Sequence, residues 1–90
     1  MINENPILPT IHLNGTSKCD ILERIREARC AINAASHALR RATPHPRDYY
    51  PQGDGAFNEA KTQHFARMKA LDDVSEELSF VYRKIVGEGE

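Results

Sequence analysis

The sequence predicts an all-α protein, an antiparallel hairpin of two long helices preceded by an extended N-terminal arm. Three observations predict it: two stretches repeat apolar side chains at steps of three and four residues, a proline-rich segment separates them, and two prolines lie near the start. A chain of 90 residues makes one domain at most. We divide it into an extended arm over 1–13, a helical hairpin over 14–86 and a frayed tail over 87–90.

The arm should be extended because Pro6 and Pro9 fix φ and restrict the residues before them. Residues 14–17, Asn-Gly-Thr-Ser, then predict a turn and the start of a helix. Ser17 is an N-cap candidate, with Asp20 three residues later in the manner of a capping box. Free backbone N–H groups and hydroxyls at this turn could bind an anion. Simple capping is the alternative.

The first helix is expected over residues 18–42, which contain neither Gly nor Pro. Its heptad stripe consists of Ile21, Ile25, Ala28, Ile32, Ala35 and Leu39. Further alanines at 31, 34, 38 and 42 make the apolar surface broader than one antiparallel helix covers. Because so short a chain buries little of its own surface, we expect a homo-oligomer.

The two cysteines, Cys19 and Cys30, lie on this helix about 16 Å apart, too far for a disulfide. We expect both to be small buried thiols in a reducing cytoplasm. No signal peptide is visible, and no apolar run approaches the roughly 20 residues of a membrane span. Residues 17–47 hold seven bases and three acids (net +4), while residues 48–90 hold five bases and nine acids (net −4). This balance argues against a uniformly basic face for duplex nucleic acid.

The linker after the first helix begins Thr-Pro-His-Pro, which cannot continue a helix. Tyr49 and Tyr50 follow each other, so they should point to different sides and at least one should pack inward. Together with Arg47 they could bind a nucleotide, since aromatic rings stack on bases and arginine contacts phosphates. The alternative is an aromatic plug that covers the end of the hairpin.

The second helix is expected over residues 55–86, with Asp54 as its N-cap. Its stripe consists of Phe57, Ala60, His64, Arg67, Leu71, Val74, Leu78, Val81 and Ile85. His64 and Arg67 are polar where apolar side chains are expected. Either Arg67 reaches water or pairs with Asp48 while His64 bonds to a neighbour, or both line a polar pocket for an anion.

Catalysis has little support in the sequence. No nucleophile stands beside a base in a recognised pattern, and the four histidines lack the spacing of metal ligands. We therefore expect a binding protein rather than an enzyme, with no cofactor and no metal.

Three segments resemble a known family: HLNGTS at 12–17, RDYYPQG at 47–53 and FNEAKTQHFARMKAL at 57–71. They resemble the small helical-hairpin proteins that bacteriophages use as nucleotide sponges against CBASS immunity, with related members that counter Thoeris. The resemblance covers about 12–86. It implies an anti-CBASS or anti-Thoeris sponge in the cytoplasm of the infected bacterial host, assembled as a homo-oligomer, often a hexamer.

Such a sponge would bind cyclic dinucleotides, cyclic trinucleotides or cyclic ADP-ribose isomers between chains and sequester them without cleavage. The ligand-binding positions that the resemblance implies are Asn14, Thr16, Arg47, Tyr49, Tyr50, His64 and Arg67. The alternative function is that of a structural or interaction protein whose helical stripe docks a partner protein. We expect neither duplex nucleic acid nor a membrane as a partner.

Overall fold

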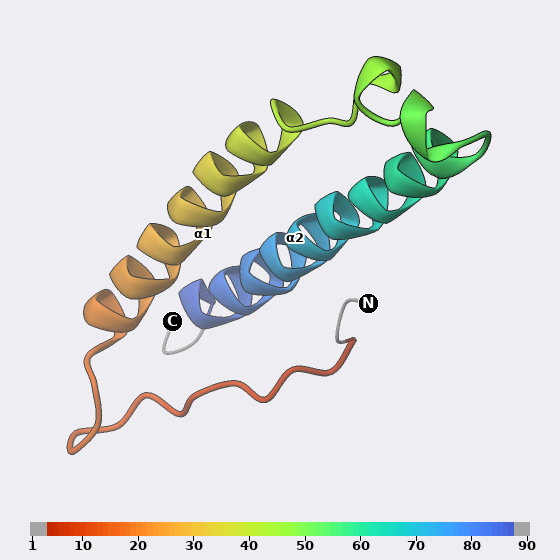
Figure 1. Ribbon diagram of the computed structural model, residues 1–90. Coiled ribbons are helices and arrows are strands. Elements are labelled where there is room, and N and C mark those ends of the chain that lie inside the picture. Colours follow the sequence, from red (N-terminus) through yellow and green to blue (C-terminus); the bar gives the residue numbers. More distant parts are fainter. Residues whose placement is uncertain (1–3, 88–90) are drawn as a thin grey trace.

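The computed structural model describes residues 4–87, which form two long helices and two short 3-10 turns and contain no strand. The elements are α1 (Lys18–Arg40), η1 (Pro46–Asp48), η2 (Tyr50–Gln52) and α2 (Ala56–Val86). The two long helices run antiparallel, and the 3-10 turns lie at the end where they are joined (Figure 1). The predicted all-α hairpin is therefore confirmed.

Helix α1 begins as predicted and ends two residues early. The Ser17 hydroxyl oxygen accepts a hydrogen bond of 3.1 Å from the backbone N–H of Asp20, which confirms the N-cap. At the other end, Arg41 and Ala42 donate to carbonyl oxygens only three residues back, so the last turn tightens. This happens just before Pro44, which disfavours helical backbone in the residue that precedes it.

Helix α2 begins at a glycine rather than at the expected aspartate. Gly55 is the N-cap, with φ of 98°, and no side chain caps this end, so the prediction of Asp54 as N-cap is wrong. Gly53 also has positive φ, at 105°. Because glycine alone adopts such backbone at little cost, these two residues set how the chain turns into α2. At the C-terminal end of α2, the Lys18 ammonium donates to the Val86 carbonyl at 3.0 Å. A positive charge there interacts favourably with the helix dipole.

The face of α1 that packs on α2 differs from the expected stripe at two positions. Ala28 and Ala35 are exposed, while Arg29 and Ser36 are half-buried in their place. The expected stripe and the observed one share their isoleucines and Leu39. They differ only at the two positions where an alanine was expected. A long side chain such as Arg29 can lay its aliphatic stem over the seam, the line along which α1 and α2 pack. An alanine methyl group is too short to do so.

Much of the remaining surface of α1 is apolar and uncovered. All the alanines that the sequence singles out are exposed: Ala28, Ala31, Ala34, Ala35, Ala38 and Ala42. Cys19 and Cys30 are free, as expected, but exposed, so the expectation that both are buried is wrong. Both cysteines lie on the side of α1 that faces away from α2.

The face of α2 that packs on α1 carries the expected His64 but not the expected Arg67. Its buried and half-buried members are Phe57, Ala60, His64, Met68, Leu71, Ser75, Leu78, Tyr82 and Ile85. Arg67 and Val74 are exposed, and Val81 is half-buried beside this face. Turning Met68 inward instead of Arg67 avoids taking an unpaired guanidinium out of water.

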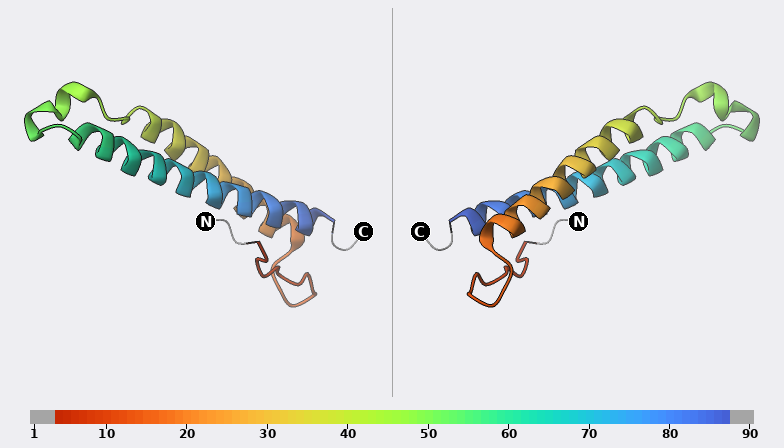
Figure 2. Two further views of the ribbon diagram at one scale, coloured as in Figure 1. Left: turned by 90° about the vertical axis from the view of Figure 1, so that its right-hand side faces the viewer. Right: turned by 90° about the vertical axis from the view of Figure 1, so that its left-hand side faces the viewer.

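The N-terminal arm runs back along α2 on the side away from α1 (Figures 1 and 2). Residues 6–12 have no regular secondary structure, as predicted, and Leu8 and Ile11 are half-buried. The expectations for residues 1–3 and 88–90 lie outside the described residues. Asp73 is two residues from the seam and points away from α1, yet it is only 8% exposed. A second face of α2, besides the one in the seam, is therefore sheltered from water.

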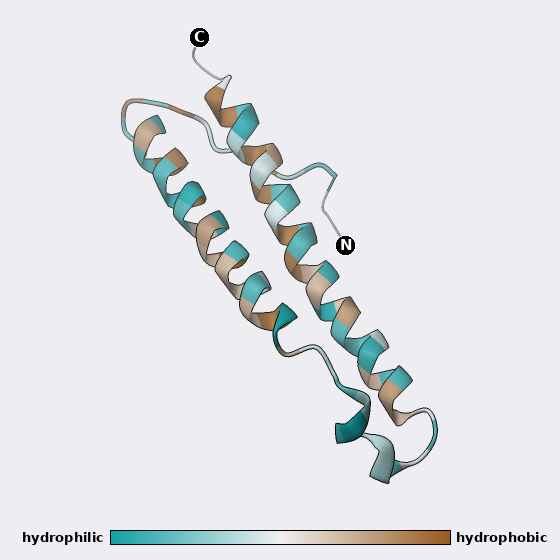
Figure 3. Ribbon diagram, turned by 90° about the horizontal axis from the view of Figure 1, so that it is seen from above, coloured by the Kyte–Doolittle hydropathy of each residue, from teal (hydrophilic) through white to brown (hydrophobic). Residues whose placement is uncertain are grey.

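The hairpin is long and leaves much surface uncovered. It measures 61 × 22 × 18 Å, with a radius of gyration of 18.5 Å, against about 12 Å for a compact domain of this length. Its accessible surface is 6840 Å², where a compact monomer of 10.2 kDa exposes roughly 5,300 Å². Apolar segments are spread along both helices instead of meeting in one core (Figure 3). Neither helix in the described range is both long and apolar enough to cross a membrane.

Replacing Asp73 with Asn should weaken the dependence of the free energy of unfolding on pH in acid. Lys69 donates to both carboxylate oxygens at 3.0 and 2.9 Å, and these bonds lower the pKa of Asp73 from its usual 3.8. The folded state then binds fewer protons than the unfolded state, so this contribution is present above about pH 3.8 and lost as pH falls through the lowered pKa. Urea unfolding at a series of acidic pH values, followed by circular dichroism, measures it.

Asp72→Asn is the matched control, because Asp72 is the exposed neighbour on the same helix. It should leave the acid dependence near that of the unaltered chain. Equal acid dependence in both variants would contradict a stabilising role for the Lys69–Asp73 pair.

Candidate functional site

The linker presents one tyrosine to the protein and one to water. Tyr49 is half-buried, and its ring centroid lies 6.5 Å from that of Phe57, with the planes tilted by 49°. Tyr50 is 76% exposed. The prediction that at least one of the two tyrosines packs inward is confirmed, although both border the same hollow. Tyr49 covers the end of the hairpin, as the plug alternative predicts, while the Tyr50 side chain lies mostly in water.

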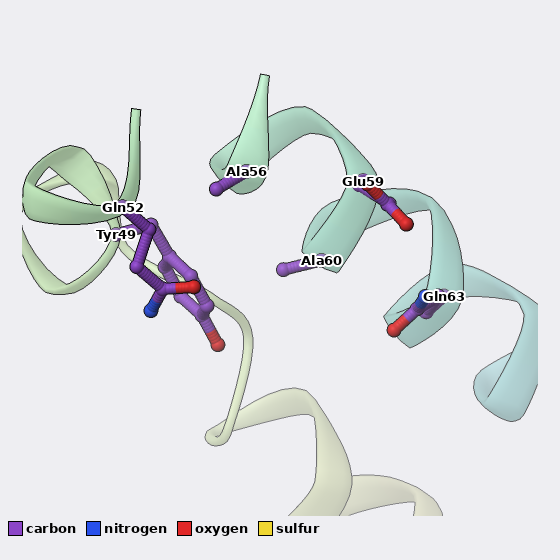
Figure 4. A pocket seen from close by; sticks show the side chains of 6 residues that line it. All are labelled: Tyr49, Gln52, Ala56, Glu59, Ala60 and Gln63. Atoms are coloured by element: carbon purple, nitrogen blue, oxygen red, sulfur yellow. The ribbon is translucent and has the colours of Figure 1, made fainter. Parts of the chain in front are cut away.

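Tyr49 stands between two hollows. The first, of about 240 Å³, lies between the linker and the first turns of α2 and is lined by Tyr49, Gln52, Ala56, Glu59, Ala60 and Gln63 (Figure 4). The second, of about 320 Å³, borders Tyr49, Tyr50 and Phe57 and the glycine turn over 53–55. Aromatic rings thus wall both hollows, and the second includes the exposed Tyr50.

The linker end carries more positive than negative charge. Its bases are Arg40, Arg41, Arg47 and Lys61, and its acids are Asp48, Asp54 and Glu59. Arg47 is exposed at the start of η1, which is fixed by a 3.2 Å hydrogen bond from its backbone N–H to His45 Nδ1. The Lys61 ammonium lies 5.4 Å above the Phe57 ring, so a cation also faces the aromatic cluster. The excess of positive charge at this end is therefore small, and three of its four bases are arginines.

His64 is buried in the seam and bonded to a neighbour. It is 3% exposed, and its Nε2 lies 3.2 Å from the hydroxyl oxygen of Thr43. That hydroxyl donates its own proton to the Arg40 carbonyl at 2.6 Å, so it accepts a bond from the His64 ring. The neighbour-bonded alternative for His64 is therefore the one observed, and this bond ties α2 to the end of α1.

Arg67 lies outside the seam, on the exposed surface of α2. The expected ion pair with Asp48 is not formed in the described part of the chain. The alternative in which Arg67 reaches water is the one observed. Its guanidinium is available to an anionic ligand from the side of the helix, about three turns from the linker.

The two remaining candidates, Asn14 and Thr16, are exposed in the turn before α1. This turn is closed by a 3.1 Å hydrogen bond from the Gly15 N–H to the His12 carbonyl. It is separated from the linker by the length of α1, about 34 Å. A single chain therefore does not bring Asn14 and Thr16 together with Arg47 or the tyrosines.

Sequence reasoning missed the polar residues of the first hollow, namely Gln52, Glu59 and Gln63. One signal was present, because Gln63 follows Glu59 by one helical turn and so shares its face. Gln52 could not be found in this way, because its place depends on how η2 folds back toward α2.

The fold and the site define a helical hairpin with an aromatic, positively charged end. No protein-family model matches the chain, and neither the curated proteins nor the solved structures yield a match. Across residues 4–87, no three or more His, Cys, Asp or Glu side chains are grouped so that they could hold a metal ion.

Replacing Thr43 with Val should lower the free energy of unfolding by about 1–3 kcal/mol, because the buried His64 ring loses its hydrogen-bond partner. Thermal unfolding followed by circular dichroism measures this. Thr62→Val is the matched control, since the Thr62 hydroxyl also bonds a carbonyl, that of Asn58 at 3.0 Å, but touches no buried histidine. Similar small losses in both variants would show that the Thr43–His64 bond does not hold the helices together.

Proposed function

We propose that this protein is an anti-defence sponge that binds cyclic oligonucleotide or cyclic ADP-ribose-type immune signals and sequesters them without cleavage. The observation that carries the proposal is the exposed Tyr50 side chain at a hollow that both tyrosines border, with the exposed Arg47 three residues earlier in the same linker. A base can stack on the ring while the guanidinium meets a phosphate. The resemblance of residues 12–17, 47–53 and 57–71 to phage nucleotide sponges supports the same function.

The energetics favour a site that two chains share. Each charge-assisted hydrogen bond to a phosphate contributes about 1.5–3 kcal/mol, and each base stacked on a ring contributes roughly 1–3 kcal/mol. Nanomolar affinity needs about 12 kcal/mol. One arginine and one tyrosine fall well short of this. Two symmetry-related chains that each supply both approach it, before the costs of ordering.

The shape of the chain supports a homo-oligomer. The hairpin exposes about 1,500 Å² more than a compact monomer, and a standard interface buries only about 800 Å² from each partner. The exposed alanines of α1 allow a second helix to approach closely. In an antiparallel arrangement of copies, Asn14 and Thr16 of one chain would lie near the linker of the next. The family that the chain resembles often forms hexamers.

The alternative is a structural or interaction protein. The exposed alanine face of α1, together with Val74 at 45% exposure on α2, would suit a different protein as well as a second copy. An adaptor of this kind does not require an exposed tyrosine and an exposed arginine in the linker, which Tyr50 and Arg47 supply. Binding measurements with nucleotides therefore separate the two functions.

Light scattering at micromolar concentration should give a mass several times 10.2 kDa, because a lone hairpin leaves its alanine face in water. Replacing Ala31 and Ala35 together with Glu should shift the mass toward that of the monomer. Replacing two exposed residues on the opposite face, Asn33 and His37, with Glu is the matched control. A monomeric mass for the unaltered chain would contradict the assembly.

Calorimetric titration with cyclic dinucleotides, cyclic trinucleotides and cyclic ADP-ribose isomers should show tight binding of at least one of them. Arg47→Ala and Tyr50→Ala should each weaken it by about tenfold or more, near 1.4 kcal/mol, with little change in melting temperature. Arg67→Ala should weaken it similarly. Tyr49→Ala should also lower the melting temperature, because that ring packs on Phe57.

Lys69→Ala, in the middle of α2 and away from both ends of the hairpin, is the control and should bind normally, since Lys69 pairs with Asp73. The ligand should be recovered unchanged after heat denaturation of the complex. Linearised or hydrolysed nucleotide that accumulates with time would show an enzyme instead of a sponge. If no compound of the panel gives heat or a thermal shift, the adaptor is favoured.

A further inference from the structure

We propose that the hollow between Tyr49 and the first turns of α2 is a subsite that reads guanine, with Glu59 as the residue that selects it. The inference rests on the proposed binding of cyclic nucleotides and adds the identity of the base. It concerns the hollow of Figure 4 and not the neighbouring one that borders Tyr50.

The walls of this hollow suit a flat ring. On one side lies the half-buried ring of Tyr49, and from α2 the methyl groups of Ala56 and Ala60 point across toward it (Figure 4). The volume of about 240 Å³ is below the roughly 300–1,000 Å³ of pockets that enclose a drug-sized ligand. One nucleobase, rather than a whole cyclic dinucleotide, therefore matches the space.

The rim supplies hydrogen-bonding groups of a defined kind. Glu59 and Gln63 border the hollow from adjacent turns of α2, and Gln52 borders it from the linker (Figure 4). A carboxylate only accepts hydrogen bonds, whereas each glutamine amide both donates and accepts. The Glu59 carboxylate makes no hydrogen bond or ion pair with the described residues, so both of its oxygens are available.

Guanine matches this rim better than the other bases do. Its N1–H and 2-amino group are neighbouring donors, which the two oxygens of Glu59 can accept together in charge-assisted bonds. Its O6 is an acceptor, which a glutamine amide such as that of Gln63 can meet. Adenine offers one donor group beside an acceptor nitrogen on the same edge, and that nitrogen would face a carboxylate oxygen.

The position of Glu59 favours contact with a base over contact with a phosphate. A carboxylate at the basic linker end would repel a phosphate, so it does not suit the anion-binding part of a site. At the rim of a hollow that Tyr49 walls from the linker side, it suits the neutral base of the same ligand (Figure 4). The first turn of α2 also favours a negative side chain there, because the helix dipole is positive at that end.

Calorimetric titration of the whole chain with cyclic di-GMP, cyclic GMP–AMP and cyclic di-AMP tests the inference. The unaltered protein should bind cyclic di-GMP about tenfold or more tightly than cyclic di-AMP. Cyclic di-IMP, which keeps N1–H and lacks the 2-amino group, should bind more weakly than cyclic di-GMP. Glu59→Gln should remove both preferences and leave the affinity for cyclic di-AMP unchanged or higher.

Glu76→Gln is the matched control, since it makes the same change at an exposed position of α2 far from the hollow. It should keep the guanine preference, and circular dichroism should show both variants equally helical. If cyclic di-AMP binds the unaltered chain as well as cyclic di-GMP, or if Glu59→Gln weakens both equally, the guanine subsite is wrong while the sponge stands. If none of these nucleotides, nor any cyclic trinucleotide or cyclic ADP-ribose isomer, binds, both proposals fail.

Discussion

Two helices share one seam and cannot enclose a core, and the rest of this structure depends on that constraint. Each helix contributes one stripe of side chains to the seam, and among the described residues Ile85 is the only hydrophobic side chain that it buries completely. The sides of the helices remain in water, apart from the second sheltered face of α2. The elongated shape and the uncovered alanines of α1 have this common origin, as does the homo-oligomer that we propose.

The linker end is ordered by a small number of contacts that lie close together. The bond between Thr43 and His64 holds the end of α1 against α2, and the Tyr49 ring packs on Phe57. These contacts use the inward-facing residues and leave Arg47 and Tyr50 outside. Residues that hold the linker thus alternate with exposed ones along the sequence, and Tyr49 does both, since its ring packs near Phe57 and also borders the two hollows.

The period of the apolar residues predicted both helices, because a heptad repeat is typical of helices that pack along a common seam. The repeat could not decide whether Ala28 or Arg29, or whether Arg67 or Met68, faces the other helix. Two heptad stripes that lie next to each other on a helix have every second residue in common and differ only at the residues between. That choice depends on which side chains reach across to the other helix, which is a property of the pair. That one of the adjacent Tyr49 and Tyr50 packs inward could be predicted from their neighbouring positions in the sequence.

The first hollow was not predictable, because it requires the left-handed Gly55 and the turn at Gln52 to bring the linker over α2. Its polar rim has a consequence for how such a protein can change over generations. Gln52, Glu59 and Gln63 are exposed and contribute nothing to the seam. Single substitutions there alter the chemistry of the rim at little cost to folding. If the hollow binds the base that we propose, a lineage can change which base it prefers step by step while the helical scaffold is inherited intact.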